Sequence, residues 1–208
     1  MSHSPDAFPR LRDRHDAGER LGEGLREYAG RADVLVLGLP RGGVPVAAVV
    51  ARALRAPLDV LTVRTLGLPG QPEMAMGAIA SGGAQVLDHQ TIAAAVVTPG
   101  EIARAAQREE LELARREAAF RRNRPPLDVA GRCAIVVDDG MATGCTMRAA
   151  VLSLRRRRAE QIVVAVPVAS TEACAALSAE ADRCVCLATP MPFFSVGEWY
   201  QDFAQLED

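Results

Sequence analysis

Lysine is absent from this sequence, so all 24 of its basic residues are arginine. The phosphate-binding loop of nucleoside triphosphatases requires the pattern Gly-x-x-x-x-Gly-Lys-Ser/Thr. The lack of lysine therefore argues against that class of enzyme. Aromatic residues are also scarce, at 4% of the chain, and the formal net charge is −2. Because no basic stripe with interleaved aromatic side chains is present, we do not expect nucleic acid as the main partner.

Long apolar runs are missing as well. No segment has the length of a membrane span and no signal peptide is recognisable, so we expect a cytoplasmic protein with no membrane partner. Cysteine occurs five times, at irregular spacings and with no Cys-x-x-Cys pair. This pattern favours reduced, buried thiols over disulfides or a zinc site. The cysteines are Cys133, Cys145, Cys174, Cys184 and Cys186.

What the chain does contain fits one α/β domain. Its 208 residues, 49% of them hydrophobic, are enough to form a single core. Neither an internal repeat nor a linker divides the chain, so we expect one domain over residues 1–208 with a core at about 10–188.

Composition and periodicity then predict the elements. Buried strands are predicted at 33–37, 58–63, 134–137, 161–168 and 183–188, with a hairpin-like pair at 76–80 and 85–87. Helices are predicted at 10–29, 46–55, 99–122, 147–157 and 171–180, and a short helix or a turn is predicted at 88–95. The segment from Thr98 to Glu101 has the pattern of a capping box. Irregular structure is predicted for a loose start at 1–9, an exposed mobile loop at 64–76 and a helix break at 123–126.

The most informative stretch runs from Cys133 to Thr146. A short apolar strand delivers two adjacent carboxylates, Asp138 and Asp139, to its C-terminal end, and a Gly/Thr turn then leads into a helix. In an open parallel α/β sheet, ligands bind where strands are followed by helices in this way. A structural turn with a solvated acidic pair is the alternative interpretation.

The turn itself has the properties of a phosphate site. Gly140 and Gly144 can adopt backbone angles that are closed to other residues. Free amides at a helix start favour an anion, and Thr143 and Thr146 add hydroxyl donors. The carboxylates would repel a phosphate, so they need a sugar diol or Mg2+ as their partner. A ribose that carries a phosphate and a metal-binding diphosphate would use the whole stretch.

A second strand-to-helix junction lies at residues 38–45, with the sequence Gly-Leu-Pro-Arg-Gly-Gly-Val-Pro. Its free amides and Arg41 suit a diphosphate. Without other support, a simple turn would be the more common interpretation of this motif.

Residues 136–146, Val-Val-Asp-Asp-Gly-Met-Ala-Thr-Gly-Cys-Thr, resemble the phosphoribosyl-diphosphate (PRPP) signature of type I phosphoribosyltransferases. Within that family the chain is similar over nearly its full length to the bacterial "predicted phosphoribosyltransferase" group. The similar segments are 8–21, 38–46, 63–80, 136–146 and 192–205. The resemblance implies a Rossmann-like parallel sheet flanked by helices, with a small hood formed by the C-terminal tail (189–208) and a flexible loop. It also implies Mg2+ as cofactor and a homodimer.

The resemblance further implies a reaction and a set of residues. A 5-phosphoribosyl group would pass from PRPP to a nitrogenous base or related acceptor, with release of pyrophosphate. The catalytic residues would be Asp138, Asp139, Arg41 and Arg64. Of these, the two aspartates would hold the ribose hydroxyls and contact Mg2+ through PRPP or water. The 5'-phosphate would bind to Ala142, Thr143, Gly144, Cys145 and Thr146. The pyrophosphate would bind to Arg41, Gly42, Gly43 and Arg64.

Two departures from the family pattern leave the activity open. The loop at 64–76 would close over the site and exclude water. Relatives often carry a lysine where Thr65 stands, so either Arg64 supplies the charge or the chain is a non-catalytic PRPP sensor. Relatives that act on 6-oxopurines commonly carry an aspartate where Ala142 stands. That acceptor class is therefore less expected, and the base remains unidentified.

Two further features allow two interpretations each. Five of the eight aromatic residues lie in the tail. Phe193, Trp199 and Tyr200 either plug the end of the core or form a hood that stacks on the acceptor. The arginine run at 155–158 either complements a helix dipole or forms an anion site.

Overall fold

A five-stranded parallel sheet with the order β2-β1-β6-β7-β8 forms the centre of the protein. The computed structural model describes residues 8–121, 125 and 128–206, so most of the predicted loose start and of the predicted helix break lies outside it. The strands are β1 (Val34–Gly38), β2 (Leu58–Val60), β6 (Cys133–Val137), β7 (Gln161–Val168) and β8 (Arg183–Ala188). The predicted α/β class and parallel sheet are thereby confirmed.

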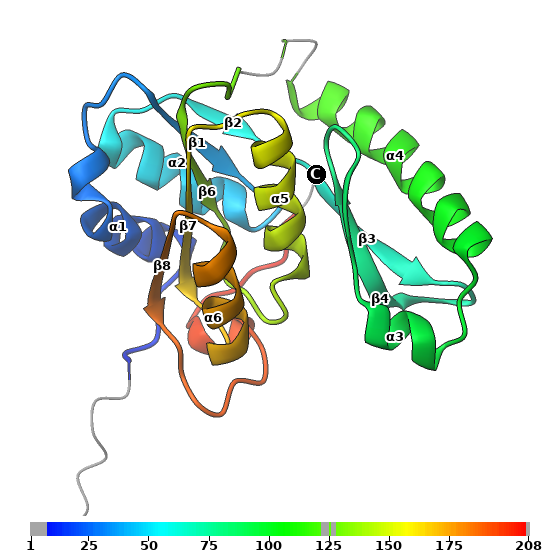
Figure 1. Ribbon diagram of the computed structural model, residues 1–208. Helices are drawn as coiled ribbons and strands as arrows, with labels where there is room; N and C mark the ends of the chain where they lie inside the picture. The colour runs from blue at the N-terminus through cyan, green and yellow to red at the C-terminus, as the bar shows by residue number, and fades with distance from the viewer. Residues whose placement is uncertain (1–7, 122–124, 126–127, 207–208) are drawn as a thin grey trace, which may run out of the picture.

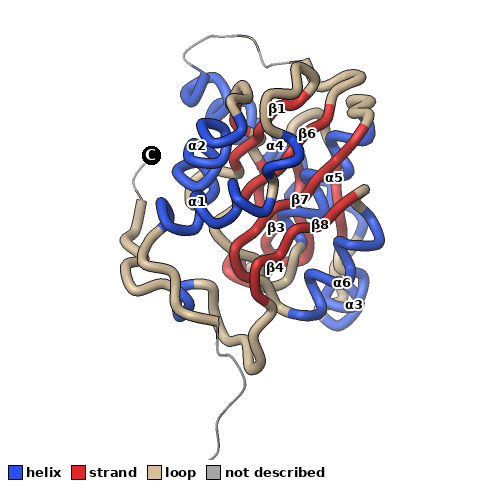
Figure 2. The backbone as a smooth tube through the Cα atoms, turned by 90° about the vertical axis from the view of Figure 1, so that its left-hand side faces the viewer, coloured by secondary structure: helices blue, strands red, loops and turns tan. Residues whose placement is uncertain are grey.

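Helices cover both faces of this sheet (Figures 1 and 2). Helices α1 (Arg14–Gly24) and α2 (Gly43–Leu54) lie on one face, and α5 (Cys145–Arg156) and α6 (Thr171–Glu180) on the other. Alternate residues of each strand point to opposite layers: Val36 packs with α1 and α2, whereas Leu35 packs with α5 and α6. Because both faces are buried, the strands are continuous apolar runs, which is why composition alone predicts them.

A smaller antiparallel sheet lies beside the main one, with the order β3-β4-β5. Its strands are β3 (Val63–Leu68), β4 (Gln71–Ala80) and β5 (Ala84–Leu87), and it packs with α3 (His89–Ala94) and α4 (Pro99–Arg121). Figure 1 shows α4 running along the outer side of β3 and β4. Ala78, Ala80 and Ala84 of this sheet form a cluster with Ala149 of α5, which joins the two units.

The predicted exposed loop at 64–76 is wrong, because most of this stretch is the β3–β4 hairpin. Its glycines and prolines are typical loop signals. In the structure Gly67 lies against the backbone of Pro72, where no side chain fits, and the strand register shifts at this point. Small residues here serve the close approach of two strands, which composition cannot distinguish from a loop.

Other boundaries follow from local contacts. The first helix begins at Arg14 because Asp13 caps it by accepting a 2.8 Å hydrogen bond from the Asp16 amide. It ends at Gly24, and a 3-10 turn, η1 (Arg26–Tyr28), follows. A second 3-10 turn, η2 (Gly197–Trp199), lies in the tail.

The capping box at the start of α4 is confirmed. The Thr98 amide donates to Glu101 Oε2 at 2.9 Å, and the Glu101 amide donates to Thr98 Oγ1 at 3.3 Å. Among the residues described, no helix combines the length and the apolar character needed to cross a bilayer.

The alanine contact between α5 and the smaller sheet yields a stability prediction. Ala149 is fully buried there, so Ala149→Leu should overpack the contact and lower the free energy of unfolding by about 1–3 kcal/mol. The control is Ala118→Leu on the exposed side of α4, which should change stability by less than about 0.5 kcal/mol. Urea denaturation followed by circular dichroism measures both, and equal effects would contradict this packing.

Candidate functional site

The two predicted binding loops lie next to each other at the carboxyl edge of the main sheet. Strands β1 and β6 are parallel neighbours, and Gly38 is paired with Val137. One loop follows β1 and leads into α2, and the other follows β6 and leads into α5. The chain connects β1 to β2 on one side and β6 to β7 on the other, so the strand order reverses between them. A crevice at such a reversal is the usual ligand site of an open α/β sheet.

The backbone of the first loop lies directly against the acidic doublet. A Cβ atom on Gly42 would overlap the carboxylate of Asp139, and one on Gly43 would overlap the backbone at Val137 and Asp138. Glycine is therefore favoured at both positions. The prediction of free amides is wrong at Gly43 and Val44, whose amides donate to the Leu39 and Arg41 carbonyls at 3.0 and 3.2 Å. The Pro40–Arg41 peptide is cis.

Arg14, at the start of α1, forms an ion pair with the second carboxylate of the doublet. Its Nε lies 2.8 Å from Asp139 Oδ2, and the two side chains are only 12% and 13% exposed. Tyr200 donates its hydroxyl to the Asp139 carbonyl oxygen at 2.6 Å. Arg14 also donates to the Ala204 carbonyl at 2.9 Å and lies over the Phe203 ring at 4.0 Å. The first helix and the tail therefore meet at Asp139.

Nothing in the sequence pattern points to Arg14, because it lies 125 residues from Asp139 in the chain and belongs to no binding motif. The only signal is indirect: residues 8–21 are one of the segments in which the chain resembles the family.

Burial makes the doublet electrostatically unfavourable on its own. It raises the pKa of Asp138 well above its usual range, and the neighbouring charge of Asp139 adds to the shift. Burial also raises the pKa of Asp139, although the hydrogen bond from Arg14 opposes this. Two adjacent, half-buried carboxylates gain from a cation or from hydroxyl donors. Titratable groups perturbed in this way concentrate at functional sites.

The second loop leads into a helix start suited to an anion. Gly144 has a φ of +77°, which favours glycine, and no side chain in the described part of the chain caps α5 at this residue. The first amides of α5, beginning at Cys145, can therefore serve an anionic ligand. Hydrogen bonds to the end of β7 and the start of α6 fix this loop. The Met141 amide donates to the Val168 carbonyl at 2.9 Å, and Ser170 Oγ donates to the Ala142 carbonyl at 2.7 Å.

The two predicted cations occupy different environments. Arg41 is exposed in the first loop. Arg64 lies in β3 and is engaged by α4, since its Nε is 2.9 Å from Glu109 Oε2. Thr65 is exposed on the same strand. Glu109 could not be singled out from the sequence because it is one of many charges along the predicted helix.

The tail covers the end of the β6 loop. Val196 packs against Gly140, where a Cβ atom would overlap its side chain. Tyr200 is only 4% exposed and belongs to the core, so its ring has no open face for stacking in this structure. Phe193 and Trp199 are half-buried against the same core. A role for these two rings in a hood stays a prediction.

The arginine run at 155–158 makes contacts between elements. Arg155 lies 2.9 Å from the Asp182 carboxylate, and Arg156 donates to the Gly83 carbonyl at 2.8 Å. These two residues therefore tie α5 to the segment before β8 and to the β4–β5 turn. Neither contact tests the predicted anion site.

Comparison with known proteins identifies the family. The sequence profile of the phosphoribosyl transferase domain matches residues 10–202. A Mycobacterium tuberculosis protein whose name contains the words phosphoribosyl transferase is 46% identical over 196 residues, which are 94% of this chain and 44% of that protein. The chain thus spans less than half the length of this relative.

Solved structures with a similar fold are also known. The crystal structure of a Thermus thermophilus protein has a TM-score of 0.79 and 43% identity, and the match covers 95% of this chain and 93% of that one. A purine phosphoribosyltransferase from Pyrococcus horikoshii, with a TM-score of 0.51 and 18% identity over 94% and 93% of the chains, shares the fold. The chain belongs to the phosphoribosyl transferase domain family.

Proposed function

We propose that the protein transfers the 5-phosphoribosyl group of PRPP to a nitrogenous acceptor and releases pyrophosphate. The observation that carries this proposal is the position of the half-buried Asp138–Asp139 pair between two glycine-containing loops at the reversal of strand order. A ligand there would meet carboxylates in the centre and amides on both sides. PRPP has the matching groups in the same order: a phosphate, a diol and a diphosphate.

The doublet would accept hydrogen bonds from the ribose hydroxyls. Asp139 is oriented for this by Arg14, and Asp138 is fixed by the 2.8 Å hydrogen bond that its Oδ1 accepts from the Asp139 amide. The start of α5, from Ala142 to Thr146, would bind the 5'-phosphate. Arg41, Gly42 and Gly43 would bind the diphosphate.

A divalent cation fits the same place, because the doublet carries two carboxylates and Arg14 pairs with only one of them among the residues described. Asp138 and Asp139 would hold Mg2+ through PRPP or water. When bound, Mg2+ supplies neutralisation of charge on the diphosphate.

In the proposed reaction, the bond between ribose C1 and the diphosphate oxygen breaks and its electron pair leaves with pyrophosphate. The acceptor nitrogen donates its lone pair to C1 and afterwards loses its proton. Positive charge develops on the sugar and negative charge on the leaving group, so preorganised amides and guanidinium groups at the diphosphate lower the barrier. Exclusion of water protects the ribosyl cation from hydrolysis.

The second candidate function is a PRPP sensor without turnover. Two observations favour it: Thr65 occupies the position at which relatives often carry a lysine, and Arg64 is held by Glu109. A pyrophosphate-release assay with Mg2+, PRPP and a panel of bases separates the two functions. Release with at least one base supports the transferase, whereas tight PRPP binding with no release for any base supports the sensor.

The diol site gives a binding prediction. Asp138→Asn with Asp139→Asn removes two charge-assisted hydrogen bonds of about 1.5–3 kcal/mol each, so PRPP affinity should fall at least about 100-fold. The control is Asp128→Asn, at an exposed position away from both loops, which should leave affinity unchanged. Isothermal titration calorimetry measures all three proteins, and unchanged affinity in the double variant would refute the assignment.

The raised pKa of Asp138 gives a stability prediction with a defined sign. A carboxyl group whose folded-state pKa exceeds its unfolded value destabilises the fold increasingly as pH rises from the unfolded pKa through the folded one. Asp138→Asn removes this penalty and should stabilise the ligand-free protein by about 0.5–2 kcal/mol at pH 7. The gain should vanish below about pH 4, where aspartate is protonated in both states.

The control for this experiment is Asp182→Asn, which should have the opposite sign. A hydrogen bond from Arg155 lowers the pKa of Asp182, so its carboxylate stabilises the fold at neutral pH and the variant should lose stability there. Urea denaturation at pH 7 and at about pH 3 measures both. A loss of stability in Asp138→Asn at pH 7 would show that the doublet is a structural feature.

Arg64 gives a kinetic prediction. If it neutralises the leaving group, Arg64→Gln should lower kcat about 100-fold or more and change PRPP affinity little, because Arg41 and the first loop remain. Glu109→Gln releases the guanidinium and should not lower kcat. Steady-state pyrophosphate release measures kcat, and an equal loss in both variants would mean that the ion pair only stabilises the fold.

A further inference from the structure

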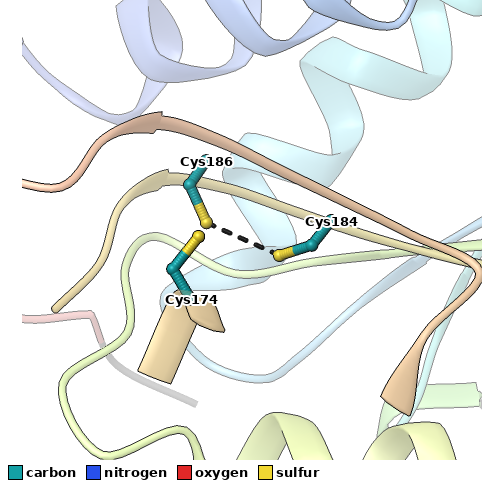
Figure 3. A group of neighbouring side chains, drawn as sticks. All are labelled: Cys174, Cys184 and Cys186. Atoms are coloured by element: carbon teal, nitrogen blue, oxygen red, sulfur yellow. Dashed lines mark hydrogen bonds between the residues drawn. The ribbon is translucent and has the colours of Figure 1, made fainter. Parts of the chain in front are cut away.

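Three cysteine side chains converge outside the two binding loops (Figure 3). Cys174 comes from α6, and Cys184 and Cys186 come from β8. Their three sulfur atoms all lie within 4.8 Å of one another. The Sγ atoms of Cys184 and Cys186 are 3.6 Å apart and hydrogen-bonded. All three are half-buried, free thiols.

Rigid elements fix this arrangement. Residues two apart in a strand point to the same face, and the register with β7 pairs Cys184 with Val164 and Cys186 with Val166. Val185 and Leu187 point to the opposite layer, toward α1 and α2. Cys174 lies in the first turn of α6, which Ser170 caps by accepting a 3.1 Å hydrogen bond from the Ala173 amide. The sulfurs thus converge through the fold itself and not through a mobile loop.

The spacing suits a metal ion bound to thiolates. A zinc–sulfur bond of about 2.3 Å in tetrahedral geometry puts neighbouring sulfurs about 3.8 Å apart. Soft thiolate ligands select Zn2+ and Cu+ over Mg2+ or Ca2+. We propose that Cys174, Cys184 and Cys186 together bind one soft metal ion, Zn2+ or Cu+, at a site separate from the PRPP loops. Three sulfur ligands would complete the coordination of Cu+, whereas Zn2+ would take a water molecule as its fourth ligand.

Ordinary core packing accounts less well for these residues. Cys133 shows what a packing cysteine looks like here: it is 1% exposed and lies among apolar side chains of the core. The three clustered sulfurs instead face one another at the edge of the core and remain partly open to solvent. An ion could reach them without unfolding of the sheet. The irregular sequence spacing conceals the site, because one ligand lies on the helix and two on the following strand.

A bound ion would join α6 to β8 close to the candidate phosphate loop. Ala173, the residue before Cys174, lies beside Gly144. The Ser170 hydroxyl donates to the Ala142 carbonyl at 2.7 Å. The expected consequence is a more stable α6, which a thermal measurement can detect independently of any enzymatic activity.

The experiment uses the full chain, reduced and freed of metal. Zn2+ is titrated in competition with a chromophoric chelator, and Cu+ is titrated without oxygen against a Cu+-selective chelator. We expect one ion per chain and a rise in Tm of about 5–10 °C when the free ion exceeds Kd 100-fold. Co2+ in place of Zn2+ should give a near-ultraviolet sulfur-to-cobalt charge-transfer band.

Variants locate the site. Cys174→Ser and Cys186→Ser should each weaken binding at least about 100-fold, since even loss of an outer-shell partner costs 10–100-fold. Cys174→Ala and Cys186→Val repeat the test with side chains that leave no buried hydroxyl. Cys133→Ala, with its thiol in the other core layer, should bind the ion unchanged.

Two results would overturn the proposal. One is that the reduced protein binds neither ion more tightly than the variant with all three cysteines replaced. The other is that Cys133→Ala weakens binding as much as Cys174→Ser, which would place the ion elsewhere. The readouts are metal affinity and Tm, so neither result depends on whether the protein transfers phosphoribosyl groups.

Discussion

The contact between Gly42 and the carboxylate of Asp139 is the constraint on which the rest of the candidate site depends. It exists because β1 and β6 are paired in register, so the loops that leave them emerge side by side. A side chain at Gly42 would displace the Asp139 carboxylate from the position in which Arg14 holds it. The same closeness removes water from the doublet, which is why the pKa of Asp138 is raised. The fold thus tolerates an unfavourable pair of charges where a ligand with hydroxyls or a cation would relieve it.

Arg14 offsets only part of the electrostatic repulsion within the doublet. Its side chain also connects the doublet to distant parts of the chain. The guanidinium contacts Asp139, the Phe203 ring and the Ala204 carbonyl at once. Tyr200 completes the arrangement through the carbonyl oxygen of Asp139. The first helix and the tail are therefore held by polar contacts at Asp139 in addition to their own apolar contacts. A change of charge at Asp139 should therefore alter the position of the tail, which covers the β6 loop.

The parts of this structure that could be predicted are those with local signals. Apolar runs predict the buried strands. The stretch after Val137 predicts the acidic doublet and the start of a helix, because its aspartate, glycine and threonine residues lie next to one another in the sequence. Arg14 and Glu109 could not be predicted, since each acquires its partner only when distant segments pack. Composition predicts a loop in place of the β3–β4 hairpin because a glycine such as Gly67 gives the same signal in a tight strand contact as in a turn. The cysteine cluster has no sequence signal for a related reason: its three residues belong to two elements, α6 and β8.

Binding and transfer depend on different parts of the protein under the proposed function. The groups assigned to ribose and phosphate come from the β6 loop and α5, and the first diphosphate amides come from the β1 loop, all anchored in the main sheet. The second cation, Arg64, belongs to the smaller sheet and is neutralised by Glu109 of α4. In a chain without lysine, no other type of side chain can supply a permanent charge to the leaving group. Under that function, the most recognisable motif of the sequence bears on PRPP binding, and turnover depends on Arg64, a cation of the smaller sheet.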